Sequence, residues 1–284
     1  MAIDLSDKVC LITGADEGLG FGLVQGFLKR GAEVAAGLLN FEKSASRVAP
    51  ALPVAMDVTQ PDQVSSAVAA VVAKFGRIDV LINNAGIYPR IAADEVLPED
   101  WLRVQDVNLN GTWRSCMAAI PHFKAQGGGS IINIGSVTLR LGMANLSHYI
   151  SSKGGVVGLT RGMARDVGRY GIRVNCLHLG AIQTDGEKRL SPADAAALAE
   201  VESLQSIPGR QSPSSVEPTF AFLPLTKVKT SPASASPSIA AGFTSRPSCK
   251  FSRERLPDCR LTLPATLPPR VTIPKFYIPF SVWI

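Results

Sequence analysis

The chain has few of the residues that build metal sites or disulfide frameworks. It holds only three histidines, and its five cysteines show no metal-ligand spacing: Cys10, Cys116, Cys176, Cys249 and Cys259. The first and third lie inside apolar runs, where a thiol is usually a small buried hydrophobe. The sequence therefore predicts no bound metal and no disulfide, and a reducing, cytoplasmic location is expected.

Long hydrophobic runs are also missing. No apolar run approaches the roughly 18 residues of a membrane-spanning helix. The first residues, MAIDLSDK, lack a basic segment followed by an apolar one. We therefore expect neither a secretory leader nor a membrane partner.

Acidic residues are scarce in the last quarter of the chain. Residues 1–210 hold 20 basic and 20 acidic side chains, whereas residues 211–284 hold 9 basic and 3 acidic ones and 12 of the 20 prolines. We predict one domain over residues 1–210 and a basic, Pro/Ser-rich, largely irregular tail over residues 211–284. The neutral body gives no support for nucleic-acid binding by the folded part.

Six short apolar runs alternate with segments of helical spacing. The runs are continuously apolar, as buried parallel strands are: KVCLITG, AEVAAGLL, LPVAMDV, DVLINNAG, SIINIGS and IRVNCLHL. Helical spacing lies between them, over Leu19–Arg30, Pro61–Phe75, Trp101–Gln126 and Tyr149–Tyr170. The alternation predicts an α/β fold, a doubly wound parallel sheet with helices on both faces. Ligands of such sheets bind beyond the carboxyl ends of the strands.

A glycine-rich turn follows the first apolar run. In TGADEGLG, Gly14, Gly18 and Gly20 stand at a strand-to-helix junction, where they permit a tight backbone and close approach of a pyrophosphate to the helix N-terminus. The alternative is an ordinary glycine-rich turn, because the spacing is not G-x-G-x-x-G.

Polar residues follow the later apolar runs. Asn83–Gly86 (NNAG) comes after the fourth run, Ser136 after the fifth, and Asn108 lies inside a predicted helix. Tyr149 and Lys153 are four residues apart, on one face of a helix. Each alone has an ordinary explanation as a turn, cap or solvated residue. Their joint placement where the strands end favours a functional site.

Together these motifs resemble those of the short-chain dehydrogenase/reductase family, over roughly Leu5–Thr184. TGADEGLG is similar to the family's TGxxxGxG turn, NNAG to its structural signature, and Ser136 precedes Tyr149 by the usual interval. The resemblance implies a Rossmann-like fold and an NAD(P)-dependent oxidoreductase that interconverts a ketone and a secondary alcohol by hydride transfer. It also implies a homo-oligomer.

The resemblance implies a catalytic role for Asn108, Ser136, Tyr149 and Lys153. Tyr149 would exchange a proton with the substrate oxygen. The Lys153 ammonium would lower the pKa of that phenol and hold the nicotinamide ribose. Ser136 would hydrogen-bond the substrate carbonyl, and Asn108 would anchor a water that links Lys153 to solvent. His148 is expected to be a rim or packing residue.

The cofactor contacts implied by the resemblance are Gly14, Asp16, Glu17, Gly18, Leu19, Gly20, Asp57, Val58, Asn84, Ala85, Gly86, Tyr149, Lys153, Ile182 and Thr184. Asp57 would contact adenine, and Thr184 the nicotinamide carboxamide. NAD or NADP would be the cofactor. Leu38 stands where the family's NAD-type Asp would be, but the carboxylate of Glu17 lies at a position that is often basic in NADP-dependent relatives. The sequence thus favours NAD.

The sequence indicates less about the substrate than about the cofactor. Tyr88 and Arg90 are expected at the rim of the site, residues 137–148 at one wall, and residues 185–205 as a mobile lid helix. The expected substrate is a small, moderately apolar ketone or secondary alcohol.

After about residue 222 the sequence departs from the family. The resemblance predicts a helix ending in FL, a loop and a seventh strand, whereas the chain continues with Ser, Pro and Lys. Read out of frame, codons for residues 224–239 can encode the expected loop and strand. We therefore hypothesise a frameshifted C-terminus and no normal seventh strand, which would weaken homo-oligomer assembly. A natural disordered tail is one alternative. The alternative function is a catalytically impaired nucleotide-binding protein of the same fold.

Overall fold

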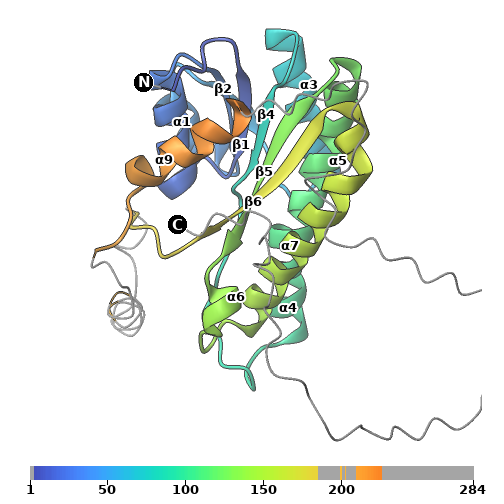
Figure 1. The fold of residues 1–284 in the computed structure, drawn as a ribbon. Helices are drawn as coiled ribbons and strands as arrows, with labels where there is room; N and C mark the ends of the chain where they lie inside the picture. Colours follow the sequence, from blue (N-terminus) through green and yellow to red (C-terminus); the bar gives the residue numbers. More distant parts are fainter. Residues whose placement is uncertain (1–2, 185–198, 200–201, 203–208, 226–284) are drawn as a thin grey trace, which may run out of the picture. The chain divides into compact units, whose positions relative to one another are not determined.

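The computed structural model describes residues 3–184, 199, 202 and 209–225 (Figure 1). Six strands pair in parallel in the order β3-β2-β1-β4-β5-β6. Their bounds are β1 (Val9–Thr13), β2 (Glu33–Leu38), β3 (Leu52–Ala55), β4 (Val80–Asn83), β5 (Gly129–Ser136) and β6 (Ile172–Leu179). The strand order reverses between β1 and β4, which is where such sheets bind ligands.

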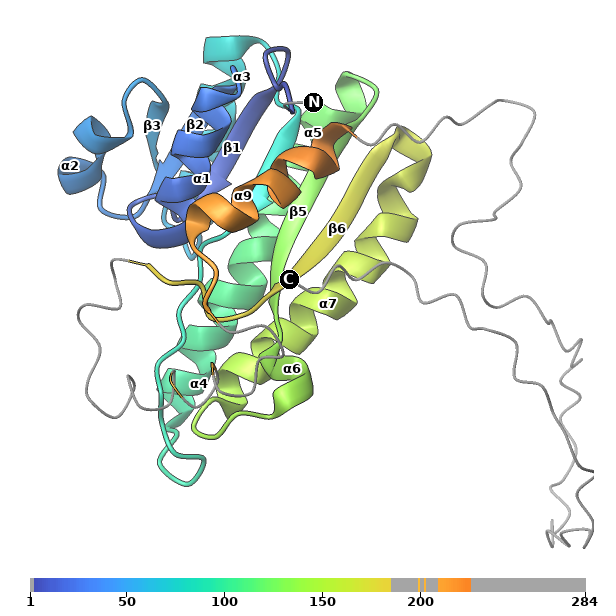
Figure 2. The same cartoon turned by 60° about the vertical axis from the view of Figure 1, so that its left-hand side comes forward.

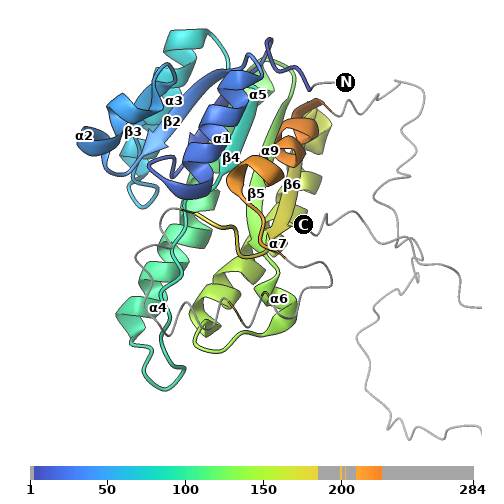
Figure 3. The ribbon, with the colours of Figure 1, turned by 90° about the vertical axis from the view of Figure 1, so that its left-hand side faces the viewer.

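The helices are α1 (Gly18–Lys29), α2 (Phe41–Ser44), α3 (Pro61–Phe75), α4 (Pro98–Gln105), α5 (Gly111–Ala125), α6 (Thr138–Leu141), α7 (Ser147–Val167) and α9 (Pro213–Phe222). Short 3₁₀ turns span Ala45–Val48, Gly168–Tyr170 and Leu223–Leu225. Figure 2 shows α1 and α9 in front of the sheet, and Figure 3 shows α3 and α5 behind it.

Both faces of the sheet are buried. On one face, Cys10 and Ile12 of β1 pack with apolar residues of α1 and α9. On the other, Val9 and Leu11 of the same strand pack with α3, α5 and α7. Because successive strand residues point to opposite faces, a strand buried on both reads as one continuous apolar run. The predicted doubly wound parallel sheet is therefore confirmed.

The helix expected over Trp101–Gln126 is interrupted. A turn of π-helix, Asp106–Asn110, separates α4 from α5. Such a turn inserts an extra residue into a helix, and π-turns are frequent at functional sites. The sequence placed the helical segment correctly, but periodicity alone did not reveal this interruption.

The helix predicted to end in FL is present as α9, which packs against α1. Two glycines of α1 permit the close approach: a Cβ at Gly22 would lie 2.4 Å from Pro213 Cβ, and one at Gly26 would lie 2.4 Å from Glu217 Cγ. Arg30, which follows α1 directly, donates from Nε and Nη2 to the two carboxylate oxygens of buried Glu217, at 2.7 and 2.8 Å. The described packing thus continues to Leu225, and the domain boundary at residue 210 stays a prediction.

Other predictions fall outside the described residues. These are the absence of a seventh strand, the frameshifted segment and most of the lid helix over residues 185–205. Of that lid, the structure describes Ala199 and Glu202, which are helical.

The α1–α9 contact makes a prediction about stability. Gly26→Ala would push a methyl group into Glu217, which the Arg30 ion pair holds in place. We expect this to lower the free energy of unfolding by about 1–3 kcal/mol. Gly158→Ala on α7 is the matched control: its Cβ would meet nothing within 4 Å, and helix propensity favours Ala by about 1 kcal/mol. Urea unfolding of both variants measures the difference. Equal shifts in the two variants would contradict the packing argument.

Candidate active site

The glycine turn and the NNAG segment form one unit at the carboxyl ends of β1 and β4. Gly14 has φ of +62°, and a Cβ there would lie 2.8 Å from the Cα of Ala85. A Cβ at Gly20 would lie 2.2 Å from Gly14 O. Thr13 Oγ1 accepts hydrogen bonds from the amides of Asn84 and Ala85, both at 3.0 Å. Asn84 Nδ2 donates to the carbonyls of Thr13 and Gly14 at 2.9 Å. The sequence reasoning treated these as two motifs, and the fold joins them.

The start of α1 suits an anion. Gly18 has φ of +61°, and a Cβ there would make ordinary contact with the side chain of Thr184 at 3.5 Å. Glu17, which precedes the helix, makes no side-chain cap hydrogen bond, and the first turn holds no acidic residue. The positive end of the helix dipole therefore carries no side-chain cap. The arrangement fits a dinucleotide pyrophosphate.

The remaining predicted cofactor residues border the same edge. Leu19 and Ile182 are partly buried against the core beneath α1. Asp57 follows β3 and accepts hydrogen bonds from Thr59 N at 2.9 Å and Thr59 Oγ1 at 2.7 Å. Val58 is buried, and a Cβ at Gly111 would lie 2.6 Å from its Cγ2. These contacts hold Asp57 at the end of β3.

Asp16 reaches from the glycine turn to the end of β2. Its Oδ2 accepts from Leu39 N at 2.9 Å and its Oδ1 from Asn40 N at 2.8 Å. Its own carbonyl accepts from Arg47 Nη1 at 3.3 Å, and that guanidinium lies over the ring of Phe21. A carboxylate therefore stands at the end of the second strand, although Leu38 occupies the sequence position where the family's Asp was expected.

Lys153 is a buried cation on α7. Its Nζ donates to Ile134 O on β5 at 2.8 Å and lies 5.8 Å from the centroid of the Tyr149 ring. Burial lowers the pKa of Lys153 to about 8, and the neighbouring Cys176 opposes this shift. A Cβ at Gly86 would lie 3.8 Å from Nζ, in ordinary van der Waals contact, so the NNAG segment borders the ammonium.

The pKa of Tyr149 is shifted in the direction opposite to the one predicted from the sequence. Burial raises the pKa of Tyr149, and the nearby Ser136 side chain only partly opposes that shift. We expected Lys153 to lower this pKa. The expectation was wrong, because burial of the phenol outweighs the interactions that favour the phenolate.

Ser136 lies at the carboxyl end of β5. Its Oγ accepts from Thr138 N at 3.2 Å and from Thr138 Oγ1 at 2.8 Å. Because Oγ accepts these bonds, its own hydrogen can be donated to another oxygen. Ser136 can thus donate toward the place where a substrate carbonyl would meet Tyr149.

Asn108 is fully buried in the π-turn and held by three hydrogen bonds. Its Oδ1 accepts from Ile87 N at 2.8 Å, and its Nδ2 donates to Ile87 O at 2.9 Å and to Ser152 Oγ at 3.0 Å. A Cβ at Gly86 would lie 3.3 Å from Oδ1. Asn108 therefore fixes the segment after NNAG to α7. Its role as a water anchor stays a prediction.

Sequence reasoning missed three contacts around this site. His148 is fully buried, with Nε2 2.8 Å from Pro89 O. The ring of Tyr88 meets that of Tyr149 edge to face, with centroids 6.2 Å apart. His178 Nδ1 lies 3.3 Å from Ser136 O. No periodicity signals them, because each joins segments that are distant in sequence.

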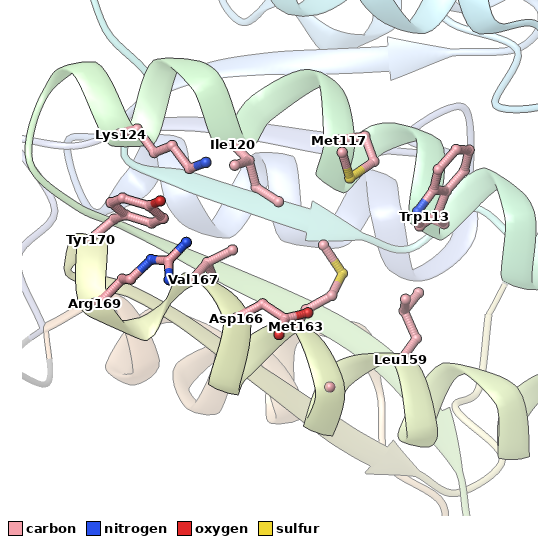
Figure 4. Close-up of a pocket in the computed structure, with 11 residues that line it drawn as sticks. Trp113, Met117, Ile120, Lys124, Leu159, Met163, Asp166, Val167, Arg169 and Tyr170 are labelled. Carbon is pink, nitrogen blue, oxygen red and sulfur yellow. The ribbon is translucent and has the colours of Figure 1, made fainter.

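Two other kinds of feature were not found among the described residues, and one further cavity was. They contain no cluster of three or more His, Cys, Asp or Glu side chains that could hold a metal ion. No helix among them is long and apolar enough to cross a membrane. A cavity of about 400 Å³ lies between α5 and α7 (Figure 4), lined by Trp113, Met117, Ile120, Lys124, Leu159, Gly162, Met163, Asp166, Val167, Arg169 and Tyr170. It contains none of the four predicted catalytic residues, so it is not the candidate active site.

Comparison with known proteins places this geometry in a family. The family model described as short chain dehydrogenase matches residues 8–195. The chain is 38% identical over 193 residues to the 3-oxoacyl-(acyl-carrier-protein) reductase FabG of Thermotoga maritima, covering 66% of this chain and 78% of that protein. It is 39% identical over 193 residues to the trans-4-hydroxycyclohexanecarboxylate dehydrogenase of Sinomonas cyclohexanicum, covering 63% and 74%.

A solved structure agrees with these relatives. The 3-ketoacyl-(acyl-carrier-protein) reductase of Brucella melitensis complexed with NADH is 31% identical, with a TM-score of 0.70 over 78% of this chain and 91% of that one. The chain therefore belongs to the short-chain dehydrogenase/reductase family of NAD(P)-dependent oxidoreductases.

Proposed function

We propose that this protein interconverts a small ketone and a secondary alcohol, with Tyr149 exchanging the proton on the substrate oxygen. One observation carries the proposal: the ring of Tyr149 lies 5.8 Å from Nζ of buried Lys153, and Ser136 is close enough to the phenol to oppose the rise of its pKa. This group lies next to a turn suited to a pyrophosphate. The reaction consumes a ketone, the reduced dinucleotide and a proton, and yields an alcohol and the oxidised dinucleotide.

The chain's own residues supply binding and proton handling. Gly14–Gly20, Asn84–Gly86 and Thr184 would hold the dinucleotide, which supplies or accepts the hydride when bound. The raised pKa of Tyr149 keeps its phenol protonated at neutral pH, so it is ready to donate to a carbonyl oxygen. Ser136 would donate a second hydrogen bond to that oxygen and stabilise its developing negative charge. Lys153 would hold the ribose beside Tyr149.

A cofactor and substrate screen tests the proposal. Purified full-length protein is titrated with NADH and NADPH by fluorescence, and oxidation of the bound cofactor is then followed with a panel of ketones. Ketone-dependent oxidation supports the proposal. Dinucleotide binding without turnover of any ketone, in a protein that unfolds at low temperature, supports instead the impaired nucleotide-binding protein considered as the alternative.

For the cofactor we propose NAD(H). A carboxylate at the end of β2 can accept hydrogen bonds from ribose hydroxyls and repels a 2′-phosphate. Asp16 occupies that place, and its two amide contacts use only about half of the acceptor positions of a carboxylate. Arg47 lies beside it and is the cation that could receive a phosphate if the carboxylate were removed.

Replacement of Asp16 by Ser should therefore relax cofactor choice. We expect the parent protein to bind NADH at least tenfold more tightly than NADPH, because a 2′-phosphate carries close to two negative charges. Asp16→Ser should reduce that ratio about tenfold, and Asp16→Ser combined with Arg47→Ala should weaken NADPH again. Glu42→Gln on α2 removes the same charge without this contact and should change the ratio less than twofold. An unchanged ratio in Asp16→Ser would sink the assignment.

A further inference from the structure

We infer that Tyr88 is a specificity residue of the active site, whose ring favours ring-bearing ketones over open-chain ketones of the same size. The inference rests on the proposed function, because it concerns which ketones reach Tyr149. It is carried by the way the segment Ile87–Pro89 is held beside the ring of Tyr149.

The backbone on both sides of Tyr88 is fixed by side chains of other elements. On one side, Asn108 binds both the N–H and the carbonyl of Ile87, at 2.8 and 2.9 Å. On the other side, His148 Nε2 lies 2.8 Å from Pro89 O. Tyr88 is thus the central residue of a tripeptide whose backbone is clamped by three hydrogen bonds with two side chains.

This clamp places an exposed aromatic ring beside the reacting group. The ring of Tyr88 stands at 66° to that of Tyr149, with the centroids 6.2 Å apart, yet its residue keeps 59% of its surface exposed. A ketone whose oxygen meets the Tyr149 hydroxyl would therefore bind in the neighbourhood of the Tyr88 ring. Its ring offers a flat apolar surface at little conformational cost.

The flat ring of Tyr88 should distinguish between ketones by their shape. A cyclic ketone can lay one face of its ring on the phenyl plane, and it has no internal rotations to lose on binding. An open-chain ketone with the same number of carbons covers the plane less completely and must order several bonds. Tyr88 should therefore contribute more to the binding of cyclic ketones than to that of linear ones.

A role in positioning Pro89 explains the buried His148 better than packing alone does. The imidazole is fully buried, and its Nδ1 has no hydrogen-bond partner among the described residues. A buried nitrogen without a partner destabilises the fold. An apolar residue would fill the same space without that cost, but it could not donate to Pro89 O. The backbone carbonyl of His148 in turn accepts a hydrogen bond from Gln105 Nε2 at 2.9 Å.

The experiment compares kcat/KM for cyclohexanone and 2-hexanone with NADH in the full-length protein. The parent should prefer cyclohexanone. Tyr88→Phe keeps the ring and should preserve that preference within twofold. Tyr88→Ala should lower kcat/KM for cyclohexanone about tenfold while changing the value for 2-hexanone less than threefold.

The clamp is tested with two substitutions of His148. His148→Leu removes the donor to Pro89 O and should reduce the preference in the same direction as Tyr88→Ala. His148→Gln retains an N–H donor and should restore most of it. Because each readout is a ratio between two substrates, a loss of folded protein affects both terms equally and does not imitate the effect.

Several results would overturn the inference. They are a parent that prefers 2-hexanone, equal loss for both ketones in Tyr88→Ala, or His148→Gln behaving like His148→Leu. Failure of the proposed function looks different, because the parent would then turn over neither ketone. In that case, the calorimetric affinities of the two ketones for the NADH-loaded protein and its Tyr88→Ala variant decide the ring preference.

Discussion

Tyr149→Phe should lower kcat for ketone reduction at least about a thousandfold and leave NADH binding within about threefold of the parent. The substitution removes one oxygen from a side chain on α7 and keeps its ring, so packing against Tyr88 is retained. The substitution removes the proposed proton donor and its interaction with Ser136. Positioned acid catalysis contributes about 10²- to 10⁴-fold, and loss of the substrate hydrogen bond adds to this.

Stopped-flow or steady-state oxidation of NADH measures the change, with fluorescence titration for the affinity. Tyr170→Phe is the matched control, since Tyr170 lies beside Lys124 and Arg169 and outside the candidate site. It should retain more than half of the parent's kcat. Turnover in Tyr149→Phe above a tenth of the parent's would remove Tyr149 from its proposed role.

Lys153→Met should abolish most turnover and yet make the protein more stable. The ammonium is buried, and burial lowers its pKa from 10.5 to about 8. Holding that charge inside the fold therefore costs free energy at neutral pH, on the order of 1–3 kcal/mol. Methionine fills a similar volume without a charge. Loss of the proposed ribose contact and of the cation beside Tyr149 should reduce kcat/KM at least about a hundredfold.

The contribution of Lys153 to the free energy of unfolding changes with pH in a definite direction. Because the folded pKa lies below the unfolded one, the unfolded chain binds more protons between about pH 8 and 10. The contribution of this group to stability therefore rises with pH across that window and is at its least favourable below it. In Lys153→Met that rise should vanish. Urea unfolding at pH 7 and pH 10 measures it, and a variant that is less stable than the parent at pH 7 would contradict the account.

The sequence was a good guide to the layers of the fold. Strands buried on both faces, such as β1, must be continuously apolar, and this property is visible without coordinates. The four long helical segments were found from the helical spacing of their apolar residues, which is also visible without coordinates. For Pro61–Phe75, the predicted first and last residues are those of α3. The π-turn at Asn108 was missed, because one inserted residue barely changes the spacing of apolar positions.

The sequence indicated which residues belong to the candidate site, but it did not indicate the contacts between them. Glycine spacing pointed to the turn, yet the fold shows that Gly14 and Gly20 also make room for Ala85 and Asn84. The direction of the Tyr149 pKa shift depends on burial, which a helical i, i+4 spacing does not reveal. The Asp16 carboxylate at the end of β2 and the His148 contact to Pro89 join distant segments, and no local pattern reports such pairs.

The central claim is that this chain carries out hydride transfer at the site formed by Tyr149, Ser136 and Lys153. The most direct measurement uses NADH with deuterium at the transferable position of the nicotinamide and cyclohexanone as the ketone. The account predicts that mass spectrometry finds one deuterium on the carbinol carbon of cyclohexanol, and that Tyr149→Phe forms at least about a thousandfold less labelled alcohol in the same time. Full NADH binding with no labelled alcohol from any ketone tested would contradict it.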